Sequence, residues 1–418
     1  MKIPQEYKQT EVGIIPEDWE IIRLKDIGTF SKGCGISRAE ANSGHIPCVR
    51  YGEIYTSHDI YIKKFYSFIS EDIAKCSRQI KKGDILFAAS GETKEEIGKC
   101  VAFVSDCEAY AGGDIIIFTP KSKFDSKYLG FILNTSELTK QKASKGQGDA
   151  VVHITTESLS ELIVPIPSRI DEQQEIAEAL SDVDKLIAAL DKKIAKKKLI
   201  KQAAMQQLLT GKKRLQGFCE KWHTILLANN TIMNSGGTPL SSNPEYYDGD
   251  IPFLSISDIT DAGKYINKTE RCITEKGLNN SSAKMFVKGT IMYAMYASLG
   301  KCAISNISLT CSQAILGIVP NNEIDSEYLY YYLCFIEDSV KELGQTGTQS
   351  NLSKQLVQNF AVFLPKSITE QQAIAKILSD MDEEILDLER KRDKYKLLKN
   401  GMMQKLLTGQ IRLNIQYI

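Results

Sequence analysis

The chain has 418 residues, of which 43% are hydrophobic and 25% charged, and this fits a globular protein with two or more domains. Its 52 basic and 52 acidic residues balance, which excludes a uniformly basic nucleic-acid coat but allows local patches. No apolar stretch approaches the roughly 20 residues needed to cross a bilayer, and the first residues are polar, so we expect a cytoplasmic protein.

Two segments of similar pattern predict mixed α+β domains. Short runs rich in Ile, Val and aromatic residues, bounded by Gly or Pro, are typical of strands. They occur at 83–90, 99–104 and 114–120, and again at 289–296, 301–305 and 314–320. One helix is predicted after each set, over 126–144 and 326–343, because apolar residues recur three and four positions apart.

Each α+β segment is followed by a segment that the chain contains twice. Residues 171–215 align with 369–413 without a gap, and 24 of the 45 aligned positions are identical. Upstream matches are weaker and their offset drifts, so loop lengths differ between the globular copies while the helical length is constant. We therefore predict a first globular domain (1–165), a first helical repeat (166–215), a second globular domain (216–364) and a second helical repeat (365–418).

Both helical repeats have the heptad pattern of a coiled coil. Asp171 or Thr369 is expected to cap the helix N-terminus, and Gly211 or Gly409 to end it in a left-handed conformation. The predicted seam consists of Ile176, Leu180, Val183, Ile187, Leu190, Ile194, Ile374, Leu378, Met381, Ile385 and Leu388. Such a seam must be covered, so we predict that the two helices pair antiparallel with pseudo-twofold symmetry. Whether polar residues 172–174 contact a partner or only cap the helix stays open.

No sequence pattern indicates catalysis. HExxH, G-x-S-x-G and GxGxxG are absent, and "GETKEEIGKC" from Gly91 departs from the phosphate-loop pattern. The four histidines are scattered, and the ten cysteines form no CxxC pair, so neither a catalytic residue nor a metal site is predicted. We expect reduced, mostly buried thiols and a binding or assembly protein that holds no cofactor itself.

Divergent loops suggest nucleic-acid contacts. Glycine- and hydroxyl-rich turns at 31–38 and 234–247 suit phosphates or base edges, although ordinary surface turns use the same residues. Two further loops match between the copies, "SGETKEEIGK" with "ASLGK" and "SKGQGD" with "GQTGTQSN". The DNA-binding candidates are Lys32, Arg38, Arg50, Tyr51, Lys94, Lys99, Gln147, Ser235, Thr238, Tyr246, Ser298, Lys301, Gln345 and Gln349.

Taken together, these motifs resemble the specificity subunit of type I restriction-modification systems. The resemblance is carried by "YKQTEVGIIPEDWE" from Tyr7, "SGGTP…GDIPFLSISDI", "KGDILF", "GTQSNLS" and the duplicated "P…EQQ.IA..LSD.D…LLTG". It covers essentially the whole chain. In the first copy, "GQGDAVVHI" departs from the "GTQ.N.S" pattern, so no family contact carries over to that loop.

The resemblance implies a non-catalytic chain with two target-recognition domains, each of which reads half of an interrupted double-stranded DNA sequence. The antiparallel coiled coil would fix the spacing and recruit two modification subunits, which methylate adenine with S-adenosylmethionine. Restriction subunits that use ATP and magnesium can join them. The residues alone leave two other classes open: a coiled-coil scaffold that does not bind DNA, and a methyltransferase that itself binds S-adenosylmethionine.

Overall fold

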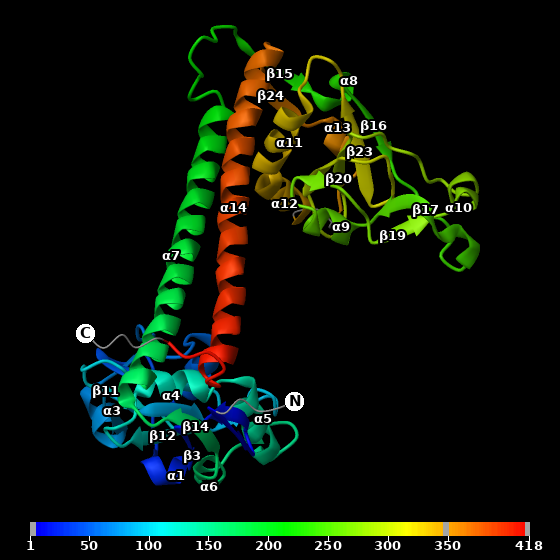
Figure 1. Cartoon of the computed structure of the whole chain (residues 1–418). Coiled ribbons are helices and arrows are strands. Elements are labelled where there is room, and N and C mark those ends of the chain that lie inside the picture. The colour runs from blue at the N-terminus through cyan, green and yellow to red at the C-terminus, as the bar shows by residue number, and fades with distance from the viewer. Residues whose placement is uncertain (1–5, 346–350, 414–418) are drawn as a thin grey trace. The chain divides into compact units, whose positions relative to one another are not determined.

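The structure is a computed structural model that describes residues 6–345 and 351–413. The chain forms two compact units, residues 1–190 with 391–418, and residues 191–390. Each unit combines one globular part with half of each of two long helices, so both crossings between the units lie within a helix (Figure 1). No helix among the described residues is long and apolar enough to cross a membrane.

The globular part of the first unit is built on two four-stranded sheets (Figure 1). The main sheet has the order β10 (Cys100–Ala102), β8 (Ile85–Ala88), β12 (Ile115–Pro120), β4 (Gly28–Lys32). The second sheet has the order β6 (Ser67–Ile69), β5 (Ile46–Val49), β11 (Ala109–Ala111), β7 (Arg78–Ile80). Along β8, Ile85 and Phe87 belong to one hydrophobic core and Leu86 and Ala88 to another. The main sheet is therefore covered on both faces, which explains its continuous apolar strands.

Smaller elements complete the first unit. The paired strands are β1 (Tyr7–Thr10) with β2 (Gly13–Pro16), β3 (Trp19–Arg23) with β14 (Ile163–Pro167), and β9 (Ser90–Gly91) with β13 (Val152–His153). The helices are α1 (Leu24–Ile27), α2 (Tyr51–Thr56), α3 (Glu71–Cys76), α4 (Ser126–Ile132), α5 (Ser136–Lys145) and α6 (Thr156–Ser160).

The second unit repeats this plan. Its main sheet has the order β16 (Thr231–Ser235), β23 (Ile315–Pro320), β20 (Ile291–Ala294), β21 (Cys302–Ser305), β18 (Tyr265–Ile266). Beside it lie β19 (Arg271–Ile273), β17 (Tyr247–Leu254) and β22 (Thr310–Cys311), and β15 (Trp222–Leu226) pairs with β24 (Ala361–Pro365). The helices are α8 (Leu227–Asn230), η1 (Pro244–Tyr246), α9 (Ile256–Asp261), α10 (Glu275–Asn279), α11 (Ser326–Phe335), α12 (Glu337–Gln345) and α13 (Lys354–Gln358). All six predicted strands are confirmed, as β8, β10, β12, β20, β21 and β23.

The prediction of a single helix after each strand set is wrong in both copies. The first copy has two helices there, α4 and α5, and the second copy has α11 and α12. In the first copy Asn134 interrupts the helix. Its Nδ2 donates 2.8 Å hydrogen bonds to the carbonyl oxygens of Gly130 and Cys100, and Thr135 is extended at φ −68°, ψ 159°. Side-chain bonds of this kind compete with a continued helix.

The long helices are α7 (Ile170–Leu208) and α14 (Ile368–Leu406), each of 39 residues or about 58 Å. They begin one residue before the predicted caps, so that prediction is wrong: Asp171 and Thr369 lie inside the first turn. Beyond the helix ends, Gly211 and Gly409 have φ values of 67° and 68°. This is the left-handed conformation expected from the sequence.

The two long helices pack side by side and antiparallel within each unit (Figure 1). In the first unit, Lys399 of α14 pairs with Asp184 of α7 at 2.8 Å; in the second, Lys201 of α7 pairs with Asp382 of α14 at 2.5 Å. These residues occupy equivalent positions of the two repeats. The predicted antiparallel pairing is confirmed, and its register is the same in both units.

The predicted seam residues are buried or half-buried. Those buried are Ile176, Leu180, Leu190, Ile194, Ile374, Leu378 and Ile385, and those half-buried are Val183, Ile187, Met381 and Leu388. The first two seam residues of each helix, however, join the globular core of their own unit. Each helix is therefore anchored in one globular part before it continues as half of a helix pair.

Candidate nucleic-acid and assembly surfaces

One end of the main sheet gathers most of the candidate loops of the first unit. There β4 and β8 end opposite the beginning of β12, so turn 33–38 and hairpin 89–98 leave the sheet together. β13 pairs with β9 at the same place and brings in the loop that carries Gln147. We call this edge the loop end of the main sheet.

The candidates of the first unit divide into free and occupied side chains. Those exposed to solvent are Lys32, Arg38, Tyr51, Lys94 and Gln147. Lys99 instead donates to the carbonyl oxygens of Tyr55 at 3.3 Å and His58 at 2.8 Å, and burial lowers its pKa. Arg50 binds Glu53 and Ser67, each at 3.4 Å. The exposed set can reach a ligand without breaking intramolecular bonds.

The second unit has an equivalent loop end, where β16 and β20 end opposite the beginning of β23. Thr238 is exposed there, whereas Ser235, Tyr246, Ser298 and Lys301 are half-buried. The segment after α12 joins them, because the Leu352 amide donates to the Met295 carbonyl at 2.9 Å. Gln349 and the side chain of Gln345, the last residue of α12, lie outside the described residues.

The glycines of the candidate turns serve the chain's own packing. The Gly33 amide donates to the Ile115 carbonyl at 2.8 Å, and a Cβ on Gly33 would lie 2.0 Å from the Gly112 oxygen. In the second copy, the Gly236 amide donates to the Ile315 carbonyl at 3.0 Å. These glycines therefore allow two turns of the same unit to approach each other closely.

Left-handed backbone at non-glycine residues also gathers at the loop ends. Ile36, Asp114 and Ala297 have φ values of 61°, 57° and 55°. Each lies in a turn that leaves or enters the main sheet there. Such conformations cost energy and persist where the surrounding structure holds them, often at functional sites.

A basic and aromatic cluster in the first unit was not identified from the sequence. Lys63 Nζ lies 5.1 Å and Lys127 Nζ 5.8 Å from the centre of the Tyr61 ring, and Lys64 Nζ lies 4.5 Å from that of Tyr66. The available signal was the stretch "YIKKFY", in which two adjacent lysines lie between two tyrosines. The cluster lies away from the loop end, because Tyr61 bridges to Ala102, which pairs with the first residue of β8.

Polar residues at the start of each long helix form a joint with the residues that follow the other helix. Arg412 donates to both carboxylate oxygens of Glu172, at 2.9 and 2.6 Å, and Trp19 Nε1 lies 3.4 Å from Oε1. Glu172 is 3% exposed, and its hydrogen bonds raise the pKa of Arg412. Bidentate pairing compensates a buried carboxylate that would otherwise be costly.

The second unit has the same joint. Arg214 donates to both oxygens of Glu370, at 2.7 and 2.8 Å, and Trp222 Nε1 lies 3.3 Å from Oε1. The internal repeat therefore extends to individual hydrogen bonds.

The next residue of each helix is a buried glutamine. Gln173 accepts from the Asp125 amide at 2.9 Å and donates to the Pro167 carbonyl at 2.9 Å. Gln371 accepts from the Asp325 amide at 2.8 Å in the same way. Asp125 and Asp325 cap α4 and α11, so the glutamines hold the long helices on the globular parts. The sequence left open whether residues 172–174 contact a partner or only cap the helix. The structure shows that Glu172 and Gln173 bind residues of their own unit.

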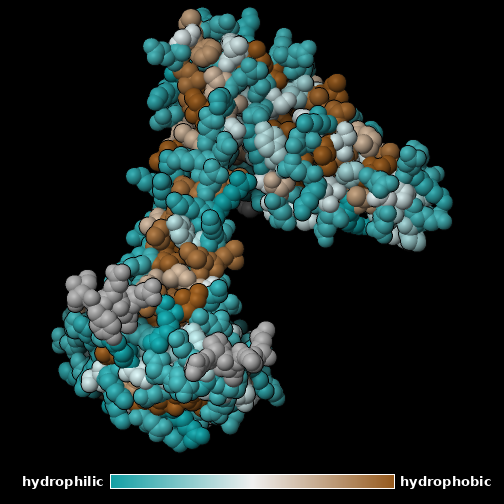
Figure 2. All heavy atoms as spheres, viewed as in Figure 1, coloured by the Kyte–Doolittle hydropathy of each residue, from teal (hydrophilic) through white to brown (hydrophobic). Residues whose placement is uncertain are grey.

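Two equivalent pairs of apolar side chains on the long helices are exposed. Leu199 and Ile200 on α7 are 65% and 43% exposed, and Leu397 and Leu398 on α14 are 73% and 49% exposed. Exposed lysines precede each pair, Lys193 and Lys196 in the first repeat and Lys391 and Lys394 in the second. Figure 2 shows hydrophobic residues on the surface of the helical segments. Exposed apolar side chains of this kind are candidates for contact with a partner.

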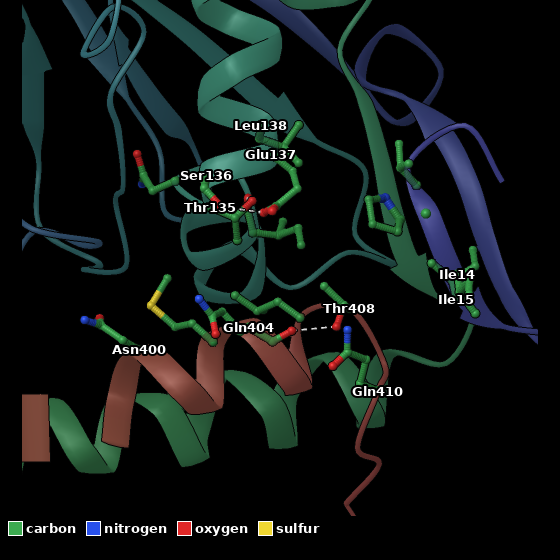
Figure 3. Close-up of a pocket in the computed structure, with 17 residues that line it drawn as sticks. Ile14, Ile15, Thr135, Ser136, Glu137, Leu138, Asn400, Gln404, Thr408 and Gln410 are labelled. Carbon is green, nitrogen blue, oxygen red and sulfur yellow. Dashed lines mark hydrogen bonds between the residues drawn. The ribbon is translucent and has the colours of Figure 1, made fainter. Parts of the chain in front are cut away.

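A pocket of about 450 Å³ lies between the β1–β2 hairpin, the start of α5 and the last turns of α14, all within the first unit (Figure 3). Its polar rim includes Thr135, Glu137, Asn400 and Gln404. At the corresponding place of the second unit, Phe335, the last residue of α11, and Ile336, which follows it, pack on the core.

The cysteines are less buried than expected. Cys48, Cys100, Cys302 and Cys311 are buried, Cys272 and Cys334 are half-buried, and Cys34, Cys76, Cys107 and Cys219 are exposed. The expectation of mostly buried thiols is therefore wrong. Within the described part of the chain, no group of three or more His, Cys, Asp or Glu is placed to hold a metal ion.

Residues 16–199 and 220–397 each match the family described as "Type I restriction modification DNA specificity domain". The chain belongs to this family. Each match covers one globular part and most of the long helix that follows it, so the specificity domain occurs twice.

Full-length relatives support this assignment. The specificity chain is 28% identical to the putative type I restriction enzyme MjaX specificity subunit of Methanocaldococcus jannaschii, over 98% of this chain and 97% of the relative. It is 26% identical to the MjaVIII specificity subunit of the same organism, over 95% and 94%. The S subunit structure from M. genitalium matches with a TM-score of 0.62 at 17% identity over 97% and 98%, a likeness of fold.

Proposed function

We propose that each unit reads one half of a bipartite DNA target through the loop end of its main sheet. As a specificity subunit of a type I restriction-modification system, the chain is a non-catalytic DNA-recognition component. One contrast between the two units carries the proposal. The joints have equivalent hydrogen bonds and the helix pair has the same register in both units, whereas the loop-end segments differ in sequence and length. Matched parts serve equal partners, and divergent parts serve different half-sites. The four predicted segments, 1–165, 166–215, 216–364 and 365–418, are part of this proposal.

We propose the exposed candidates as the first contacts with DNA. Arg38 and Lys94 can reach phosphates or guanine edges, and Gln147 can bind adenine in the major groove. Thr238 offers a hydroxyl in the second unit. Lys99 and Arg50 are held by intramolecular bonds, so we propose that they stabilise the fold at the loop end and do not contact DNA.

The half-site assignment can be tested with binding assays on the assembled modification complex. Arg38→Ala and Lys94→Ala should each weaken binding by about 1–3 kcal/mol on the intact target. On duplexes whose first half-site is scrambled, a substitution that removes a base contact should have little further effect, whereas one that removes a phosphate contact should weaken binding to the same extent. Lys25→Ala is the matched control, since Lys25 is exposed in the same unit but precedes β4 at the other end of the strand. Equal losses for Lys25→Ala would contradict a special role of the loop end.

We further propose that two modification subunits dock on the two exposed apolar pairs of the long helices. The pairs are equivalent in sequence and each belongs to a different unit, which supports two identical partners. The neighbouring lysines fit an apolar partner surface with an acidic rim.

Native mass spectrometry of the complex tests this docking. Leu199→Glu or Leu397→Glu alone should leave one modification subunit bound, and the double variant should leave none. Leu240→Glu is the matched control, because Leu240 and Leu199 are both 65% exposed but Leu240 lies in the turn after β16. Two bound subunits on the double variant would refute the proposed sites.

S-adenosylmethionine, ATP and magnesium belong, in this proposal, to the modification and restriction subunits. The chain itself holds no cofactor and acts in the cytoplasm, where its DNA is. Titration calorimetry of the isolated chain with S-adenosylmethionine distinguishes this proposal from a methyltransferase, which would bind the cofactor by itself.

A further inference from the structure

Two thiols of the second unit lie against each other at the contact between its main sheet and α11. Cys302 is the first residue of β21, and Cys334 lies in the last turn of α11. Their Sγ atoms are 3.8 Å apart. Cys302 is 7% exposed and Cys334 is half-buried, so Cys334 is the more accessible residue of the two.

The first unit has the same contact with different chemistry. Cys100 and Asn134 occupy the equivalent positions. Asn134 Nδ2 donates to the Cys100 carbonyl at 2.8 Å, and its Oδ1 accepts from the Cys100 amide at 3.2 Å. These two positions therefore connect strand to helix in both units, by an amide in the first and by two thiols in the second.

The surroundings of the two thiols are unequal. The hydrogen bond that it shares with Cys302 lowers the pKa of Cys334, and nearby Lys201 acts in the same direction. The Cys334 hydrogen bond and burial raise the pKa of Cys302. Because the thiolate is the nucleophile, Cys334 is the thiol that reacts first with an oxidant.

We propose that Cys302 and Cys334 form a reversible disulfide when the protein meets a peroxide. The Cys334 thiolate attacks one peroxide oxygen, the O–O bond breaks, and a sulfenic acid and water result after proton transfer. The Cys302 thiol then attacks the sulfenic sulfur, the S–S bond forms and a second water leaves. The two thiols lose two electrons, hydrogen peroxide gains them, and a dithiol reductant reverses the reaction.

The disulfide would fix the contact by which α11 holds the helix pair. Tyr331 of α11 donates its hydroxyl to Asp382 of α14 at 2.8 Å, and Lys201 Nζ lies 5.4 Å from the centre of the Tyr331 ring. A covalent link from β21 to α11 restrains this group from the sheet side. Oxidation is therefore expected to slow amide hydrogen exchange in α11.

Peptide mapping of the full chain before and after hydrogen peroxide tests the proposal. Trypsin leaves both thiols in one peptide, residues 302–341, whereas cleavage after glutamate separates them into 276–323 and 328–337. The expected product is a peptide pair joined through Cys302 and Cys334, lost on addition of dithiothreitol. Overoxidised Cys334, or a link that joins two copies of the chain, would overturn the proposal.

Variants identify the reacting thiols. Cys334→Asn places the residue of the first unit at this position and should abolish the link, as should Cys302→Ser. Cys311→Ser is the matched control: this buried thiol shares the 276–323 peptide with Cys302, and its loss should leave the link intact. Should a variant fold poorly, the fragment spectrum of the wild-type peptide pair decides between Cys302 and Cys311. Unchanged amide exchange in α11 after complete oxidation would refute the restraining effect.

Discussion

The long helices make the spacing between half-sites a testable property. Leu190 and Leu388 are equivalent positions of the repeats, each two residues or fewer from the place where its helix passes between the units. Inserting seven helix-forming residues after each would lengthen both helices by about 10.5 Å while the heptad seam turns by only about 20°. At 3.4 Å per base pair, the unread gap should grow by about three base pairs.

The structure also predicts what one insertion alone would do. The pairs Asp184–Lys399 and Lys201–Asp382 fix the same antiparallel register in both units. Seven extra residues in α7 only would leave α14 too short to keep both pairs. We expect the single variants to lose assembly with the modification subunits and the double variant to retain it.

Methylome sequencing of cells that carry the variants is the assay. The double insertion should methylate the same two half-sites at a longer spacing. Methylation of the original spacing by the double variant would refute the idea that the helix pair is the ruler. Loss of methylation by the double variant, with assembly intact, would show that the partners also fix the spacing.

Three further predictions concern stability, each measured by urea unfolding of the full chain. Arg412→Ala leaves the buried Glu172 carboxylate without its partner and should lower the free energy of unfolding by about 3 kcal/mol. Lys75→Ala removes an exposed ion pair and should lower it by less than about 1 kcal/mol. Equal losses for the two variants would contradict a buried joint. Burial lowers the pKa of His58, so stability should fall as the pH drops below about 6.5, and less in His58→Gln; identical pH profiles would refute this role. Leu190→Pro should cost about 3 kcal/mol or more, and a variant that still recruits its partners normally would contradict the helix as their platform.

Much of the fold could be predicted because it follows from apolar patterning. The six strands are apolar runs, since both faces of each main sheet are covered, and the seam follows the heptad spacing. Both the apolar runs of the strands and the heptad spacing of the seam can be recognised from residues close together in the chain. Structure that depends on such local patterns can be predicted from the sequence.

The features that the sequence did not reveal depend on distant residues. Glu172 looks like an ordinary acidic residue of a first helical turn, and its burial depends on Arg412, 240 positions away. At the break between α4 and α5, Asn134 binds Cys100, which lies 34 positions earlier in the chain. For the candidate site, the sequence indicated separate turns, but only the strand register shows that these turns share one end of the sheet.

The most direct test of the central claim is methylome sequencing of a host with and without the gene for this chain. Two recognition units on one chain predict that a single adenine-methylated motif disappears with the gene, and that it has two specified halves separated by a gap of constant length. Loss of a continuous motif, or an unchanged methylome in cells whose modification subunits are active, would contradict the account.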